Sequence, residues 1–198
     1  MKKINNHKII LASKSKSRKK IIENAGLIFE TVSSGVDENE IKARMSKTGA
    51  TFVQITEALA REKALTVSKD RPRSLVIGGD QILVCDGKYY DKAKDLDEAR
   101  NHLNSFKGKT HELITSITLV QNNEVIWTHT SRPRLSMRDF SNEFLDEYIE
   151  QAGDALLQSV GCYFIEGIGI HLFSNIEGEY HAIQGVPMLA LLNKLREL

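Results

Sequence analysis

Apolar runs and amphipathic stretches alternate along the first third of the chain. Residues 8–12 are mostly apolar and predict a buried strand, and residues 29–33 predict a second one. A helix running to about Ala25 is expected between them, because serines offer N-caps at its start and Gly26 ends it. Strand, helix and strand in this order favour an α/β fold.

The middle of the chain continues this pattern. A short helix is expected at 39–45, and periodic apolar positions over 51–69 predict a longer amphipathic helix. Residues 74–80 are expected to form a buried strand with the carboxylate of Asp80 at its end, and residues 81–85 to continue extended into a turn at 86–87. The remaining expected elements are a helix at 96–106 capped by Asp95, strands at 111–120 and 124–130 joined as a hairpin, a helix at 141–149 capped by Ser141, short strands broken by glycines within 161–173, and a helix at 187–196 with Pro187 in its first turn.

These elements predict a mixed sheet flanked by helices, since the early strands alternate with helices and a hairpin follows later. A length of 198 residues suffices for one α/β domain or for two small lobes sharing a cleft. Three prolines and no low-complexity tract leave no sign of a linker, so one domain over 1–198 is expected.

Composition narrows the class of protein without identifying it. The chain is 41% hydrophobic and 27% charged with a formal net charge of +1, so no global field favours nucleic acid or a membrane as a partner. No apolar stretch is long enough for a membrane helix, and residues 1–8 are too polar for a secretory signal, so a cytoplasmic protein is expected. Cys85 and Cys162 are expected to be buried free thiols, with a disulfide or a shared metal as alternatives.

Ser13-x-Ser15-x-x-Arg18 lies between the first strand and a helix N-terminus. Backbone N–H groups, two hydroxyls and a guanidinium could face one space there, which is what a phosphate requires. A solvated first turn capped by serine is an equally open alternative.

Two further sites are weaker when taken alone. Asp37 and Glu38 could supply the carboxylates that Mg²⁺ prefers, although helix capping explains them better. Lys63 could reach a phosphate from the long helix, but most helical lysines face water.

Gly78-Gly79-Asp80-Gln81 is stronger evidence for a functional site. An apolar strand running into this sequence places Asp80 at the carboxyl end of the strand, where α/β sheets bind their ligands. Asp80 could orient and deprotonate a water molecule or hold a metal, with an Asp-initiated turn as the alternative. Two later positions are candidates as well: Lys92 as a phosphate contact, with a surface lysine as the default, and Glu166 within a glycine-rich segment, with a plain β-bend as the alternative.

The order of these motifs resembles the Maf family of nucleotide pyrophosphatases. The similarity comprises Leu11-Ala12-Ser13-x-Ser15-x-x-Arg18, Val36-Asp37-Glu38, Glu62-Lys63-Ala64, Gly79-Asp80-Gln81, Asp91-Lys92, Gly108-x-x-His111, Gly161-x-Tyr163-x-x-Glu166-Gly167 and Gly178-x-Tyr180 leading to Gly185-Val186-Pro187. It runs from Ile9 to Leu195 and implies an elongated α/β fold with two lobes around a central cleft, related to inosine-triphosphate pyrophosphatases.

The resemblance also implies an activity and a set of roles. Members of the family split a nucleoside triphosphate into a monophosphate and diphosphate with a divalent cation, Mg²⁺ or Mn²⁺, and are proposed to clean the nucleotide pool. Asp80 matches the general base and, with Glu38, the metal site. The positions matching the phosphate contacts are Ser13, Arg18, Lys63 and Lys92. The resemblance allows for a homodimer without deciding the oligomeric state.

Ser17, Gln81 and Glu166 fall where subgroups of the family differ. Gln81 and Glu166 resemble the subgroup acting on 7-methyl-GTP more than the dTTP/UTP subgroup, and a carboxylate can accept hydrogen bonds from the N1–H and N2 amino edge of guanine. Ser17 departs from that subgroup, in which a tryptophan is expected. A nucleotide-binding regulator of cell division with little catalysis is the main alternative function, and a nucleic-acid-binding protein is a less favoured one.

Overall fold

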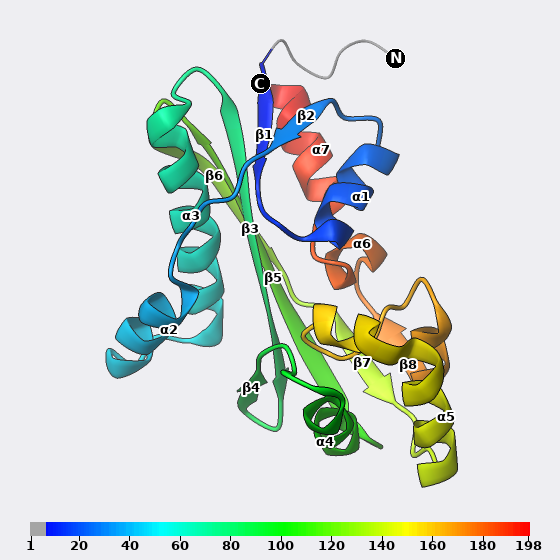
Figure 1. Ribbon diagram of the computed structural model, residues 1–198. Helices are drawn as coiled ribbons and strands as arrows, with labels where there is room; N and C mark the ends of the chain where they lie inside the picture. The colour runs from blue at the N-terminus through cyan, green and yellow to red at the C-terminus, as the bar shows by residue number, and fades with distance from the viewer. Residues whose placement is uncertain (1–6) are drawn as a thin grey trace. The chain divides into compact units, whose positions relative to one another are not determined.

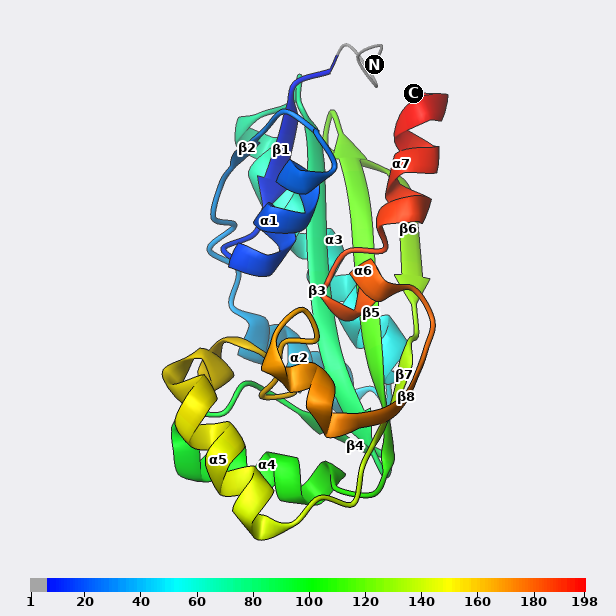
Figure 2. The same ribbon diagram turned by 90° about the vertical axis from the view of Figure 1, so that its right-hand side faces the viewer.

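The computed structural model describes residues 7–198 (Figures 1 and 2). Its elements in chain order are β1 (Ile9–Ala12), α1 (Lys16–Asn24), β2 (Phe29–Thr31), α2 (Glu38–Lys47), α3 (Phe52–Asp70), β3 (Leu75–Cys85), β4 (Lys88–Tyr90), α4 (Leu96–Phe106), β5 (Thr110–Gln121), β6 (Glu124–Ser131), β7 (Arg134–Met137), α5 (Asn142–Ala152), the 3-10 helices η1 (Gly153–Gln158) and η2 (Ile168–Leu172), β8 (Phe173–Glu177), α6 (Tyr180–Ile183) and α7 (Met188–Glu197).

Eight strands pair in the order β2-β1-β3-β5-β7-β8, with β4 on β3 and β6 on β5. β1 is parallel to β2 and β3, whereas the other pairs for which a register is defined are antiparallel. The predicted mixed sheet flanked by helices is therefore confirmed.

The chain divides into two compact units. Unit 1 takes the chain up to Gln81 together with Thr115–Ser131 and Glu179–Leu198, and unit 2 takes Ile82–Ile114 and Arg132–Gly178. Two of the four boundaries fall within β3 and β5, and the other two follow the ends of β6 and β8. The predicted central cleft and the single domain over 1–198 remain predictions.

Unit 1 buries both faces of its strands. Ile9 and Leu11 of β1 pack in a core with residues of α1 and α7, and Ile10 and Ala12 pack in a second core with residues of α3. Figure 1 shows α3 on one side of β1 and β3, and α1 and α7 on the other. Because successive side chains of a strand point to opposite faces, a strand covered on both sides is apolar at every position, which is the pattern of residues 9–12.

The predicted hairpin is formed by β5 and β6. Asn122 and Asn123 both have positive φ angles, 51° and 64°, as a two-residue turn with this twist requires. The predicted helix caps also form: Asp95 accepts a hydrogen bond from the backbone of Glu98, and Ser141 accepts one from that of Phe144.

Unit 2 contains α4, α5, η1 and η2. Its aromatic rings form a partly buried cluster of Tyr90, His102, Phe106, His111, Tyr163 and Phe173. Both cysteines belong to this unit, and both are buried free thiols as predicted. No helix within residues 7–198 is long and apolar enough to cross a membrane.

The prediction of short strands within 161–173 is wrong. This segment forms turns and η2, and a strand begins only at Phe173. Local hydrogen bonds from Gly167 N to the Phe164 carbonyl and from Ile170 N to the Gly167 carbonyl take up backbone groups that a strand would pair. The close packing has no room for a side chain at Gly169, where a Cβ would lie 2.6 Å from the Phe164 oxygen.

The strands β4, β7 and β8, the 3-10 helix η1 and the short helix α6 were not predicted. In addition, Pro187 is the N-cap residue of α7 and not part of its first turn.

Candidate functional site

A close approach of α3 to β3 fixes the first part of the site. A Cβ added at Gly78 would lie 2.1 Å from the carbonyl oxygen of Ala60 and 2.8 Å from the Cβ of Ala64. Only glycine permits this contact. Asp80 is two residues further along β3 and therefore points to the same face as Gly78, towards the helical turn that carries Lys63.

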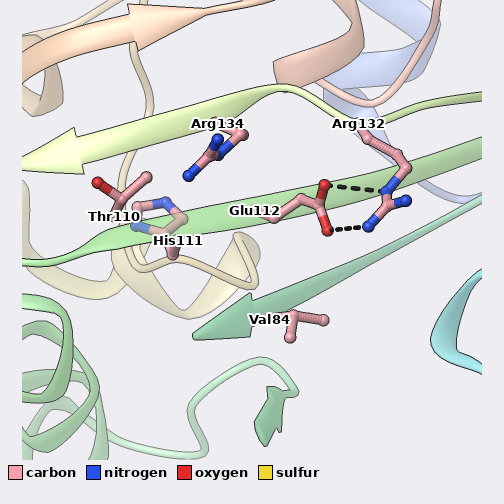
Figure 3. Close-up of a pocket in the computed structure, with 6 residues that line it drawn as sticks. All are labelled: Val84, Thr110, His111, Glu112, Arg132 and Arg134. Atoms are coloured by element: carbon pink, nitrogen blue, oxygen red, sulfur yellow. Dashed lines mark hydrogen bonds and ion pairs between the residues drawn. The ribbon is translucent and has the colours of Figure 1, made fainter. Parts of the chain in front are cut away.

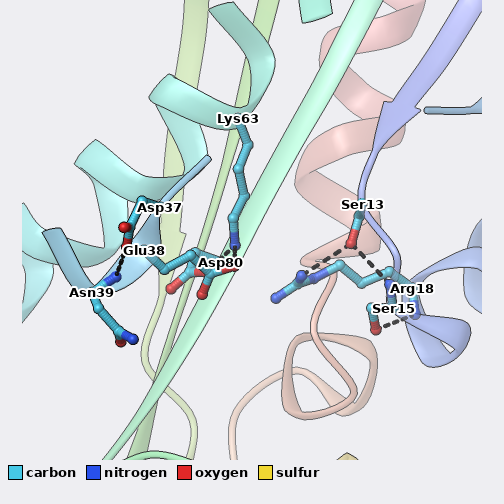
Figure 4. A network of polar contacts seen from close by, with 8 residues as sticks. All are labelled: Ser13, Ser15, Arg18, Asp37, Glu38, Asn39, Lys63 and Asp80. Carbon is cyan, nitrogen blue, oxygen red and sulfur yellow. Dashed lines mark hydrogen bonds and ion pairs between the residues drawn. The ribbon is translucent and has the colours of Figure 1, made fainter. Parts of the chain in front are cut away.

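Lys63 bridges two carboxylates (Figure 4). Its Nζ lies 2.6 Å from Asp80 Oδ1 and 2.7 Å from Glu38 Oε1. The side chains of Lys63 and Asp80 are 8% and 7% exposed, whereas that of Glu38 is 45% exposed. The structure therefore brings three predicted site residues together, with one carboxylate buried and one open to solvent.

The electrostatics of the two carboxylates differ because their burial differs. Burial is the dominant effect on Asp80 and raises its pKa, although Lys63 and Arg18 act in the opposite direction. Burial also opposes the ionisation of Glu38, but the positive charges of Lys63, Lys42 and Arg18 together lower its pKa. A carboxylate of raised pKa accepts a proton more readily than a solvated one.

The second part of the site is the segment between β1 and α1. Ser15 caps α1 by accepting a hydrogen bond from Arg18 N at 3.3 Å, so the capping alternative holds for this serine. Ser13 Oγ accepts from Ser15 N at 3.2 Å and from Arg18 Nη1 at 3.3 Å. The hydroxyl of Ser13 and the guanidinium of Arg18 thus meet, as predicted.

Arg18 lies in a slot between two glycines. A Cβ at Gly79 or at Gly185 would come within 3.4 Å or 3.3 Å of its Nε. The Nε–H donates to the Gly185 carbonyl at 3.0 Å, which fixes the side chain and leaves the Nη end to point towards Asp80 (Figure 4). Burial lowers the pKa of Arg18, and the charges of Asp80 and Glu38 oppose this shift. A guanidinium remains protonated in any case, so Arg18 is a fixed positive charge.

Asp37 and Glu38 have separate tasks. Asp37 Oδ1 accepts from the backbone N–H groups of Asn39 and Glu40, both at 3.0 Å, and so caps α2. Glu38 instead turns towards Lys63. The capping alternative therefore holds for Asp37, and the metal-binding role of Glu38 stays a prediction.

Gln81 extends the site on the other face of β3. Its Nε2 lies 2.7 Å from Thr115 Oγ1 and 3.0 Å from each of the carbonyl oxygens of Ala182 and Ile183. Neither the Gly185 carbonyl nor Thr115 had been assigned a role. Gly185 was visible only within a family motif, and a threonine inside a strand gives no signal in a sequence.

The roles expected of the remaining three residues, Ser17, Lys92 and Glu166, stay predictions. Ser17 is half-buried on α1 in unit 1. Lys92 and Glu166 belong to unit 2, where both are exposed, Lys92 after β4 and Glu166 in the turn before η2.

Unit 2 has a pocket of its own, of about 520 Å³ (Figure 3). It is lined by Val84, Thr110, His111, Glu112, Arg132 and Arg134. Glu112 binds Arg132 through both carboxylate oxygens at 2.9 Å, so this acid and this base neutralise each other. The pocket contains none of the residues that were predicted to act on a nucleotide.

Comparison with known proteins identifies the family. The family model described as Maf-like protein matches residues 8–198. The chain belongs to the Maf family. The family resemblance inferred from the motif order is therefore confirmed.

Relatives within the family match over nearly their whole length. A nucleoside triphosphate pyrophosphatase of Granulibacter bethesdensis is 46% identical over 96% of both chains. A 7-methyl-GTP pyrophosphatase of Rhizobium etli is 43% identical, again over 96% of both. A solved dITP/XTP pyrophosphatase of Mycobacterium abscessus has 17% identity and a TM-score of 0.45 over 96% of this chain and 95% of that one, which is too low to support a conclusion.

Proposed function

We propose that this Maf protein hydrolyses nucleoside triphosphates to the monophosphate and diphosphate. The observation that carries the proposal is the buried Asp80 carboxylate beside Lys63, with the open carboxylate of Glu38 on the same lysine and Arg18 directed towards them. The names of the relatives, nucleoside triphosphate pyrophosphatase and 7-methyl-GTP pyrophosphatase, support this reaction.

The positive groups would bind the phosphates. A triphosphate carries a charge near −4, and the Nη end of Arg18 together with the ammonium of Lys63 offers two cations within unit 1. Ser13 positions Arg18 and can itself donate to a phosphate oxygen. We assign a further phosphate contact to Lys92.

Asp80 would act as the general base. It accepts a proton from a water molecule as the water oxygen attacks the α-phosphorus. The bond from the α-phosphorus to the bridging oxygen breaks, and diphosphate leaves with the electron pair. The raised pKa of Asp80 favours this role, because a base whose pKa is closer to the working pH takes up a proton more readily.

The residues present fit a divalent cation. Glu38 and Asp80 already share one cation, the Lys63 ammonium, so their carboxylates face a common point. Within residues 7–198 no group of three or more His, Cys, Asp or Glu side chains could hold a metal ion. Mg²⁺ or Mn²⁺ bound by Glu38 and Asp80 would thus depend on substrate phosphates and water for its other ligands, as Mg²⁺ usually does, and would neutralise phosphate charge.

Base preference is assigned to Ser17, Gln81 and Glu166. The relatives include proteins named for 7-methyl-GTP, which agrees with a guanine-type base and a carboxylate contact from Glu166. A role in removing non-standard nucleotides from the pool would follow from such a preference.

A substrate panel tests the activity. Purified protein is incubated with Mg²⁺ or Mn²⁺ and with 7-methyl-GTP, GTP, dTTP or UTP, and the products are separated by chromatography. Equal amounts of nucleoside monophosphate and of inorganic diphosphate are expected, and EDTA should abolish the formation of both. Release of single phosphate and a nucleoside diphosphate would contradict the assigned bond. Binding without turnover for every nucleotide would instead favour the alternative, a nucleotide-binding regulator.

A further inference from the structure

The amide group of Gln81 is held by three oxygen atoms of unit 1. The amide nitrogen lies within 3.0 Å of the Thr115 hydroxyl and of the carbonyl oxygens of Ala182 and Ile183. Ala182 and Ile183 belong to the short helix α6, and carbonyls near a helix C-terminus lack partners within the helix. The Ala182 carbonyl also accepts the Gly185 N–H at 3.1 Å, so Gln81 is an additional donor to it, whereas the donor to the Ile183 carbonyl is Gln81.

This arrangement fixes which end of the amide faces which way. A backbone carbonyl can only accept a hydrogen bond, so the group opposite Ala182 and Ile183 must be the NH₂. Thr115 completes the pattern, since its hydroxyl donates to the Ala182 carbonyl at 2.9 Å and presents lone pairs to Gln81. A flipped amide would put its oxygen against two carbonyl oxygens with no hydrogen between them, which is repulsive.

The amide oxygen is left for another partner. Among the described residues 7–198, no side chain or backbone group donates to Gln81 Oε1. Gln81 is half-buried and shares a face of β3 with Gly79, over which Arg18 lies. The 182–185 segment holds both side chains, through Ala182 and Ile183 for Gln81 and through Gly185 for Arg18.

We propose that Gln81 contacts the nucleobase as a hydrogen-bond acceptor only, through Oε1, and that Thr115 and α6 are the groups that position it. The site would then select bases that offer a ring N–H or an amino group at this point. A base with a hydrogen-bond acceptor there would gain no affinity from Gln81. This inference rests on the proposed function, because it assumes a nucleotide bound beside Arg18.

Matched pairs of nucleotides test the proposal on the enzyme. In each pair the second nucleotide lacks a hydrogen-bond donor that the first one has: GTP and ITP, GTP and 1-methyl-GTP, ATP and purine riboside triphosphate, and UTP and 3-methyl-UTP. The nucleotide 7-deaza-GTP instead lacks an acceptor of GTP. Losing one neutral hydrogen bond should lower kcat/KM of the preferred base by about fivefold. In Gln81→Met, which keeps the length of the side chain but has no amide, this loss should fall below threefold. The effect of 7-deaza-GTP should be the same in both proteins.

Two results from the substrate pairs would overturn the proposal. One is that every donor deletion lowers kcat/KM of the wild-type enzyme by less than threefold. The other is a donor-dependent loss that persists in Gln81→Met.

A second measurement needs no activity. The side-chain NH₂ of Gln81, assigned by NMR from its loss in Gln81→Met, should exchange with solvent at least tenfold more slowly than that of the exposed Gln151, and should stay slow when a non-hydrolysable triphosphate binds. Exchange as fast as that of Gln151 would refute the orientation. Failure of the proposed function alone would look different, with slow exchange in a protein that hydrolyses no triphosphate.

Discussion

Gly78 and Ala60 are packed so closely that a Cβ on Gly78 would meet the Ala60 carbonyl oxygen at 2.1 Å. This contact sets the distance between β3 and α3, and hence the 2.6 Å separation of Lys63 Nζ and Asp80 Oδ1. Gly78→Ala must therefore push the helix away. We expect the variant to lose about 1–3 kcal/mol of unfolding free energy, as overpacked sites do, and most of its activity. Urea denaturation measures the loss. Gly79→Ala is the control for stability, since the nearest atoms to its Cβ would be in the side chains of Arg18 and Ile117, at 3.4 Å or more.

Asp80→Asn tests the base directly. The amide keeps an oxygen facing Lys63 but cannot take a proton from water. We expect kcat to fall by about 10²–10⁴, the usual contribution of a general base, while circular dichroism shows an intact fold. Asp86→Asn is the control, because Asp86 is an exposed acid paired with Lys109 in unit 2. Rates near wild type in Asp80→Asn would remove Asp80 from the mechanism.

Two adjacent acids provide a matched test of the metal site. Glu38→Gln should raise the Mg²⁺ concentration for half-maximal activity by about tenfold, because one of two carboxylate ligands is lost. Asp37→Asn should leave that concentration unchanged and cost at most about 0.5 kcal/mol of unfolding free energy, since asparagine is also a good cap. Equal metal dependence in both variants would argue against Glu38 as a ligand.

Arg18→Lys tests the slot between Gly79 and Gly185. Lysine has no Nε–H to donate to the Gly185 carbonyl, and its single ammonium cannot hold Ser13 and a phosphate in the same geometry. We expect kcat/KM to fall by about 10²-fold, as the loss of charge-assisted hydrogen bonds predicts. Arg71→Lys, at the end of α3, should behave like wild type. A loss confined to stability would assign Arg18 a structural role instead.

His111 should make the protein sensitive to acid. Burial lowers the pKa of His111 to about 3 from 6.5, so the folded protein keeps it neutral while the unfolded chain binds a proton below pH 6.5. Its contribution to stability is therefore complete above pH 6.5 and is lost as the pH falls towards 3. Between pH 7.5 and 5 the loss is about 2 kcal/mol.

Urea denaturation at the two pH values measures this loss. The difference between them should shrink by about that amount in His111→Phe, which removes the titrating group together with its 2.7 Å contact to Tyr163 Oη. His129→Gln is the control and should keep the wild-type difference. An unchanged difference in His111→Phe would assign the acid sensitivity to other groups.

Local features were predicted well from the sequence. The caps Asp95 and Ser141, the asparagine turn of the hairpin and the apolar run of β1 each depend on residues within a few positions of one another. The segment 161–173 was predicted wrongly, because its glycines serve local turns around Phe164 that no strand pattern reveals.

The sequence by itself determined the helices and strands that local patterns and caps specify, the residue types available for chemistry and, through its motifs, the family. Only the tertiary structure decided how those residues act. It buries Lys63, which a helical pattern would leave in water, against Asp80, and it turns Glu38 but not Asp37 to the same ammonium. It also assigns the two ends of the Gln81 amide, through carbonyls 101 and 102 residues away. The physical reason is that burial and hydrogen-bond partners, which set charge, pKa and orientation, come from segments distant in the chain, and a linear pattern contains no distances between them.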